Sequence, residues 1–352
     1  MITAVASVRA MASYALAELG DGAALSLAQN ESLRAPSPQA LAAGQVALAA
    51  SHLYPDPDWT DLRHAIAAVH PVAPAHVLCG AGSMELIGCL VRAFAGPGDD
   101  VLGTQYGYAF LSTAAQQAGA TYVAAPEADY RVDIRALLSA VTPATRLICV
   151  CNPGNPTGTR VPNSDILWLR DALPDDILLL VDQAYAEFDD QDHAAIFRLV
   201  DRGNTVVTRT LSKAYGLAGA RVGWGAMPPA IGAELRKLLN PNNIALASQA
   251  MATAAMKDQA YMRDTVALTA DIRERFAARL RSAGYDVPDS ATNFVLIPLK
   301  DSETAKRADS ALLQAGYILR GMGGYGLPHC LRATIVSEPA MTAVADILEG
   351  FA

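Results

Sequence analysis

The sequence predicts an α/β protein, in which a mostly parallel sheet is covered by helices and a smaller α+β domain follows at the C-terminus. From about residue 77 to 225, short apolar runs alternate with helical stretches, which is the pattern of repeated βαβ units. After Pro228 the pattern is mainly helical, with a few short strands near the end. We therefore expect an N-terminal arm over residues 1–30, a large domain over 31–250 and a small domain over 251–352.

The elements follow from local signals along the chain. Alanine-rich residues 1–24 predict a helical arm, and a Pro-Ser-Pro turn precedes a predicted helix over 39–53. A glycine turn ends a short strand at residues 77–79, and Ser83 is the predicted N-cap of a helix over 84–95. Further strands are expected at 101–102, 121–124, 146–151, 177–181, 206–208, 294–297, 317–319 and 331–335. Further helices are expected at 59–69, 163–172, 258–283 and 304–315.

Composition narrows the class of protein. The chain has 352 residues, 52% of them hydrophobic and 18% charged, so it can bury a large core. A net charge of −8 without a basic run argues against nucleic acid as a partner. Five scattered cysteines indicate free thiols in a reducing compartment, and no signal peptide or membrane-spanning run is visible. We expect a cytoplasmic protein that binds neither metal, membrane nor nucleic acid.

Polar residues stand where three of the predicted parallel strands end. Asn155, Asp182 and Lys213 each lie at or just after such an end. Ligands of parallel sheets bind outside the carboxyl ends of the strands. These side chains are therefore candidates for one shared site.

Lys213 suggests the chemistry of that site. A lysine beyond a buried strand loses its proton readily if it is desolvated, which suits Schiff-base chemistry. Thr210, Ser212 and Arg221 surround it in sequence, and hydroxyls with a guanidinium suit a phosphate. Together they suggest pyridoxal 5′-phosphate. A solvated turn is the alternative for the lysine alone, so the other parts of such a site must also be present.

The remaining parts of a pyridoxal phosphate site can be assigned. Asp182 follows four apolar residues and could face the pyridine nitrogen, whereas its alternative role is to cap the next helix. Tyr185 and Asn155 could bond the ring hydroxyl, and Tyr108 could stack on the ring or simply fill the core. The backbone N–H groups of three residues at a helix N-terminus would receive the phosphate: Gly82, Ser83 and Met84.

The motifs resemble those of fold-type I aminotransferases of class I and II. Lys213 lies in T-L-S-K-A-Y-G-L-A-G-A-R-V-G, Asn155 in N-P-G-N-P-T-G, and Asp182 in V-D-Q-A-Y-A-E-F. The chain is most similar to the histidinol-phosphate aminotransferase-like branch of that family. Further matches occur in the same order: Asn30-Glu31, Tyr54-Pro55-Asp56-Pro57, Gly80-Ala81-Gly82-Ser83-Met84-Glu85, Thr292-Asn293-Phe294 and Leu331-Arg332-Ala333-Thr334.

The resemblance implies further roles. It implies the large domain of a pyridoxal-phosphate fold-type I enzyme, working as a homodimer in which Tyr54 reaches the cofactor phosphate of the partner. Arg332 would bind the substrate carboxylate or phosphate, Arg320 a substrate phosphate, and Asn30 would join them at the substrate. Lys213 would then move a proton between substrate and cofactor.

The resemblance leaves the substrate open. Gln183 and Met84 replace a usual glutamate and a frequent aspartate, Arg34 stands where an apolar residue is common, and Tyr14 matches an arm tyrosine weakly. Histidinol phosphate with 2-oxoglutarate is one expectation, and an aromatic or acidic amino acid is another. A decarboxylase or lyase using the same cofactor, or a regulator with an aminotransferase-like domain, are the alternatives to a transaminase.

Overall fold

A computed structural model describes residues 2–9, 11 and 24–352. Its centre is a seven-stranded sheet of order β2-β10-β9-β8-β7-β3-β4, in which β10 alone among these strands runs antiparallel to its neighbours. This confirms the predicted mostly parallel sheet. The strands are β2 (Val77–Gly80), β3 (Asp100–Thr104), β4 (Thr121–Ala125), β7 (Thr145–Cys151), β8 (Leu178–Asp182), β9 (Thr205–Thr210) and β10 (Gly223–Ala226).

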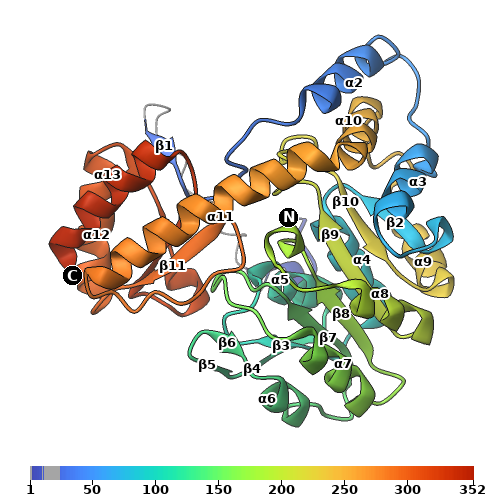
Figure 1. Ribbon diagram of the computed structural model, residues 1–352. Helices are drawn as coiled ribbons and strands as arrows, with labels where there is room; N and C mark the ends of the chain where they lie inside the picture. The colour runs from blue at the N-terminus through green and yellow to red at the C-terminus, as the bar shows by residue number, and fades with distance from the viewer. Residues whose placement is uncertain (1, 10, 12–23) are drawn as a thin grey trace.

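Helices cover both faces of this sheet, and we call the sheet with these helices the large body (Figure 1). Every residue of β8 and β9 is buried, as a central strand between two helical layers requires. Each buried leucine or valine contributes about 1.5–3 kcal/mol, so burial of these two strands stabilises the large body. The helices are α2 (Pro38–Leu48), α3 (Thr60–Val69), α4 (Ser83–Phe94), α5 (Ala109–Ala118), α6 (Ile134–Ser139), α7 (Asn163–Ala172), α8 (Ala194–Arg198), α9 (Pro229–Arg236) and α10 (Leu246–Lys257).

A second hydrophobic core lies in the C-terminal part, which we call the small body. Its antiparallel sheet has the order β11-β14-β13, formed by Phe294–Pro298, Cys330–Thr334 and Arg320–Gly321. Helices α12 (Ser302–Gln314) and α13 (Glu338–Leu348) pack beside it, and the long helix α11 (Gln259–Ser282) runs to it from the large body (Figure 1).

An N-terminal strand also belongs to the small body. Strand β1 (Leu25–Ser26) pairs in parallel with β12 (Tyr317–Ile318), and Leu27 is part of the second core. From residue 24 onward, the chain therefore runs through the small body, crosses to the large body and returns through α11. Nothing in the sequence pattern predicts this two-residue pairing.

Several local predictions are wrong. The predicted helix over 39–53 ends at Leu48, because the backbone N–H groups of residues 50, 51 and 53 bond the carbonyls three residues back, which makes turns rather than further α-helix. Gly82, with φ 82°, is the N-cap of α4, and Ser83 is its first helical residue, so Ser83 is not the cap. Of the predicted helical stretch over residues 1–24, the described residues show one short helix, α1 (Ala6–Arg9), and Tyr14 lies outside the described residues. The hairpin β5–β6 (Glu127–Ala128 and Arg131–Val132) was not predicted.

Two absences hold for the described residues. None of their helices has the length and apolarity to cross a membrane. No three His, Cys, Asp or Glu residues among them gather as metal ligands would.

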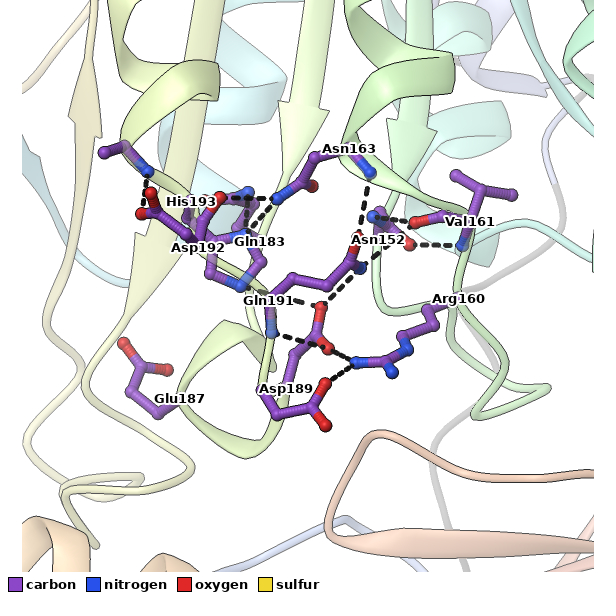
Figure 2. A network of polar contacts seen from close by, with 12 residues as sticks. Asn152, Arg160, Val161, Asn163, Gln183, Glu187, Asp189, Gln191, Asp192 and His193 are labelled. Carbon is purple, nitrogen blue, oxygen red and sulfur yellow. Dashed lines mark hydrogen bonds and ion pairs between the residues drawn. The ribbon is translucent and has the colours of Figure 1, made fainter.

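A buried polar network supports the end of β8 (Figure 2). The Gln183 side chain accepts two hydrogen bonds from Arg209 at 3.2 and 3.0 Å, and its amide nitrogen lies 3.1 Å from His193 Nδ1. His193 Nε2 lies 3.6 Å from Asp189, and Arg209 pairs with Glu187 at 3.3 Å. Since amide groups donate to Nδ1, the imidazole is neutral and carries its hydrogen on Nε2.

This network predicts a loss of stability in mild acid. The pKa of His193 is lowered to about 4, first by burial and then by Arg209. As the pH falls below the ordinary value of 6.5, only the unfolded chain gains the proton, so stability decreases. When the pH is lowered from 7.5 to 5, we expect the free energy of unfolding of the wild type to fall by about 1–2 kcal/mol more than that of His193→Gln. Urea titrations at both pH values measure this difference.

The exposed His52 provides the matched control. His52→Gln should keep the wild-type dependence on pH. If the stability of His193→Gln and of the wild type depends on pH in the same way, the proposal that the folded protein keeps His193 unprotonated is wrong.

Candidate active site

A cavity of about 440 Å³ lies at the carboxyl ends of the parallel strands, between the two bodies. All predicted site residues except Gly82 and Tyr54 line it: Asn30, Ser83, Met84, Tyr108, Asn155, Asp182, Tyr185, Thr210, Ser212, Lys213, Arg221, Arg320 and Arg332. A larger groove of about 1020 Å³ lies elsewhere, beside β5–β6 and α7, and contains none of them. The strand ends thus bring residues 300 positions apart in sequence around one cavity.

Lys213 extends into this cavity from the turn after β9. Its Nζ donates to the Gln29 carbonyl oxygen at 3.1 Å and lies 5.9 Å from the centre of the Tyr185 ring. The residue is partly exposed to the cavity, yet its amine lies deep enough that burial lowers the pKa from 10.5 to about 7. Arg332 and Arg221 lower it further, while Glu31 opposes them. A large fraction of the amine is therefore neutral near pH 7 and nucleophilic.

Asp182 ends β8 and is 3% exposed. Its Oδ1 accepts a hydrogen bond from Thr208 at 2.9 Å, and the Cys151 thiol lies 3.9 Å from Oδ2. Burial raises the pKa of Asp182 to about 6, and hydrogen bonds from Thr208, the Ala184 backbone and Cys151 oppose the rise. A cation that approached Oδ2 from the cavity would stabilise the carboxylate.

The opposite end of the cavity collects hydrogen-bond donors. Thr210 Oγ1 donates to Ser212 Oγ at 2.9 Å, and Arg221 Nη1 lies 3.5 Å from the same oxygen. Helix α4 begins here, and a Cβ on Gly223 would lie 2.2 Å from the Ser83 backbone nitrogen. This close approach needs glycine at position 223 and holds the helix N-terminus beside Arg221. Backbone N–H groups, hydroxyls and a guanidinium suit a phosphate dianion.

The small body contributes two arginines. Arg332 Nη1 donates to Asn155 Oδ1 at 2.6 Å, and Nη2 donates to the Ala28 carbonyl at 2.8 Å. In the register of β13 with β14, Arg320 stands directly opposite Arg332, so both side chains project from the same face of the sheet. A substrate in the cavity would therefore meet two cationic groups.

Tyrosines form the walls of the cavity. The Tyr185 ring packs edge-on against Phe294 at 5.2 Å, and burial raises the pKa of its hydroxyl. Its oxygen accepts a hydrogen bond from Asn30 Nδ2 at 2.8 Å. Tyr108 is half-buried and lies 6.2 Å from Phe110.

Other predicted residues lie outside the cavity. Tyr54 is 85% exposed, and Gly82 does not line the cavity; a Cβ on Gly82 would lie 2.4 Å from Arg221 Nη2, so the glycine leaves room for this guanidinium. Arg34 does not line the cavity, because its guanidinium lies 4.1 Å above the Tyr261 ring.

The prediction missed cavity residues at the strand ends. Cys151 lines the wall, and the register of β7 with β8 pairs it with Asp182. Its position at the end of an apolar run, like that of Asp182 in the next strand along the chain, was the signal that could have found it. Gln29 enters through its backbone carbonyl, which no side-chain pattern reveals.

Comparisons with known proteins identify the family of this chain. Residues 23–348 match the family described as aminotransferase class I and II. The chain is 42% identical over 311 residues to a histidinol-phosphate aminotransferase of Jannaschia sp., covering 88% of this chain and 86% of that protein. It is 42% identical over 332 residues to the enzyme of that name from Rhodospirillum rubrum, covering 93% and 90%.

A solved structure agrees as well. The histidinol-phosphate aminotransferase of Sinorhizobium meliloti in complex with pyridoxal 5′-phosphate superposes with a TM-score of 0.87 at 30% identity, covering 93% of this chain and 91% of that one. The chain belongs to the class I and II aminotransferases, within their histidinol-phosphate aminotransferase-like branch. It is a transaminase, and its cofactor is pyridoxal 5′-phosphate.

The cavity fits this cofactor. The buried Asp182 carboxylate lacks a cationic partner among the contacts described above, and a protonated pyridine nitrogen would supply one. The donors near Ser212 and α4 are set for a phosphate, and the amine of Lys213 lies between these two ends of the cavity.

The lowered pKa of Lys213 predicts how the cofactor-free protein reacts. The amine is neutral above about pH 7, so its rate of coupling to pyridoxal phosphate should rise with pH through about 7. Stopped-flow measurement of the visible absorption from pH 5.5 to 9 follows this rate. Lys213→Ala should show no such band, and a midpoint near the ordinary 10.5 in the wild type would contradict a buried amine.

Gly223 predicts an effect on cofactor affinity. Gly223→Ala places a Cβ against the Ser83 nitrogen and must displace the start of α4 from the phosphate end. We expect a rise in the cofactor Kd of about tenfold or more, which corresponds to about 1.4 kcal/mol. Fluorescence titration measures it. Gly96→Ala, whose Cβ would meet no atom within 4 Å, is the control and should bind as the wild type does.

Proposed function

We propose that this aminotransferase transfers the amino group of histidinol phosphate to 2-oxoglutarate. The observation that carries the proposal is that Arg320 and Arg332 stand opposite each other on one face of the small-body sheet, and that both line the cavity with Lys213. Two guanidinium groups suit substrates that bear a phosphate or two carboxylates, because each binds such an anion through paired hydrogen bonds. The names of the relatives support this substrate.

The residues of the cavity have distinct tasks in this proposal. Pyridoxal phosphate supplies a ring that accepts the electrons of the substrate carbon–hydrogen bond. Asp182, whose carboxylate is fixed by Thr208, would keep the pyridine nitrogen of the bound cofactor protonated. Lys213 would take the proton from the substrate carbon and return it at the C4′ carbon of the cofactor. Arg332 and Arg320 orient the substrate so that this carbon faces the lysine.

Asn155, Tyr185 and Tyr108 position the ring. Asn155 accepts from Arg332 through its oxygen, which leaves its amide nitrogen as a donor for the ring hydroxyl. Tyr185 would donate to the same ring oxygen, and Tyr108 would stack on the ring. Gly82, Ser83, Met84, Thr210, Ser212 and Arg221 hold the phosphate.

A homodimer is part of the proposal. Apolar side chains are exposed along α2 and the following turn, and together they form a patch that a second copy could cover: Leu41, Val46, Leu48, Leu53 and Tyr54. Tyr54 would then reach the partner's phosphate. A cytoplasmic location also belongs to the proposal, since all five cysteines are free thiols.

Removing Arg320 tests the substrate. Arg320→Ala should lower kcat/KM for histidinol phosphate about 30-fold or more, because loss of a charge partner costs at least about 2 kcal/mol. Turnover of histidinol, which lacks the phosphate, should change less than about threefold on this interpretation. Steady-state kinetics with 2-oxoglutarate measure both values.

Arg275→Ala is the control, since this arginine is half exposed and pairs with Asp271 and Glu338. If the wild type turns over phenylalanine but not histidinol phosphate, the proposed substrate is wrong and an aromatic substrate replaces it. Release of carbon dioxide without amino transfer would contradict transamination itself.

Tyr54 tests the shared site. Tyr54→Phe should weaken cofactor binding by about tenfold, because one hydrogen bond to a charged phosphate is lost. Mixing it with Lys213→Ala chains should give hybrid dimers with more activity than dilution allows, since one of the two sites is then intact. A fully active monomer in light scattering is the outcome that rules out the shared site.

A further inference from the structure

Residues 27–31 cross between the two bodies, and we call them the crossing segment. Groups of the small body bond four of its five carbonyl oxygens. Thr334 N bonds Leu27 O at 2.9 Å, and Arg332 Nη2 bonds Ala28 O at 2.8 Å. Asn293 Nδ2 donates to the carbonyls of residues 30 and 31 at 3.1 and 2.9 Å. The segment is therefore fixed to the small body.

The same segment also contacts two cofactor-site residues of the large body. The fifth carbonyl, that of Gln29, accepts from Lys213 Nζ at 3.1 Å. The side chain of Asn30 donates from Nδ2 to the Tyr185 hydroxyl oxygen at 2.8 Å. The small body thus contacts the cofactor pocket through this segment.

The orientation of the Asn30 amide is fixed by Thr334. Asn30 N donates to Thr334 Oγ1 at 2.9 Å, so the threonine hydroxyl hydrogen is available to Asn30 Oδ1, 3.3 Å away. The amide nitrogen must then face Tyr185. The residue is 2% exposed and holds φ 55°, a left-handed conformation that asparagine and glycine tolerate better than most residues.

This contact determines how Tyr185 can hydrogen-bond. A phenol has one hydrogen to donate, and its oxygen here already accepts from an amide N–H. The hydroxyl hydrogen cannot point at that donor, so it turns toward the cavity. Tyr185 is thereby presented to the cavity as a donor.

We propose that Asn30 is a positioning residue that sets Tyr185 as an obligate hydrogen-bond donor to the ring oxygen of the cofactor. This role differs from the contact with the substrate that the sequence predicts for Asn30. Donation to the ring oxygen favours its anionic form and thereby the reactive state of the bound cofactor. The inference rests on the proposed position of the ring beside Tyr185 and is independent of the substrate.

Two substitutions separate loss of the contact from its reversal. Asn30→Gly removes the amide but keeps the left-handed backbone. Asn30→Asp replaces the donor by an acceptor, so Tyr185 turns its hydrogen toward the carboxylate and away from the cavity. The other charged or titratable groups around Tyr185 stay unchanged in both variants: Lys213, Arg332, Cys151 and Tyr325.

The measurement is the pH titration of the visible absorption of the bound cofactor, with the cofactor Kd from fluorescence titration. Asn30→Asp should raise the apparent pKa of this absorption by about one unit or more, and Asn30→Gly by less. The Kd should rise in the same order. Thermal melts verify that each variant is folded, and Asn242→Asp, the same change at an exposed turn, should match the wild type.

A double-mutant cycle with Tyr185→Phe decides the outcome. If Asn30 acts through Tyr185, its substitutions should no longer shift the titration once the hydroxyl is gone. A shift by Asn30→Asp that persists in Tyr185→Phe overturns the inference, as does the absence of any shift in Asn30→Asp. If Tyr185→Phe itself leaves the titration unchanged, the proposed position of the ring is wrong as well.

Discussion

The pairing of β8 with β9 is the constraint on which the site depends. Its register places Asp182 opposite Thr208, so a buried carboxylate meets a hydroxyl that can hold it. Two residues further along β9 comes Thr210, and the turn that follows carries Ser212 and Lys213. A shift of one residue would turn every side chain of β9 to the other face of the sheet. The carboxylate, the hydroxyls and the amine therefore keep their places because two apolar strands are buried in one register.

The sequence predicted this part of the molecule well for the same reason. Buried parallel strands are continuous apolar runs, and the polar residue after each run marks its end, as Asp182 does after Leu178–Val181. What the sequence did not predict depends on contacts between distant segments. The pairing of β1 with β12 involves two residues on each side, too few for any periodicity. The Gln29 carbonyl is a backbone group that every residue type carries, so no residue pattern could single it out.

Ser83 shows a different limit. Serine is a favoured N-cap, but the close approach of β10 to the start of α4 requires a left-handed residue just before the helix, and Gly82 meets that requirement. Tertiary packing thus outweighed local preference at a helix end. Next to Asp182 in sequence, Gln183 hydrogen-bonds both His193, as Figure 2 shows, and the buried Arg209, and the residue type at position 183 does not by itself specify this arrangement.

Arg332 has an electrostatic consequence for the order of events. Its positive charge is one of the causes that lower the pKa of Lys213. A substrate carboxylate or phosphate bound to this guanidinium would neutralise that charge, and the free amine would become more basic. The lysine would thus be least basic in the vacant cavity, where it must act as a nucleophile, and most basic when a substrate proton is to be removed. One arginine would in this way synchronise anion binding with proton abstraction.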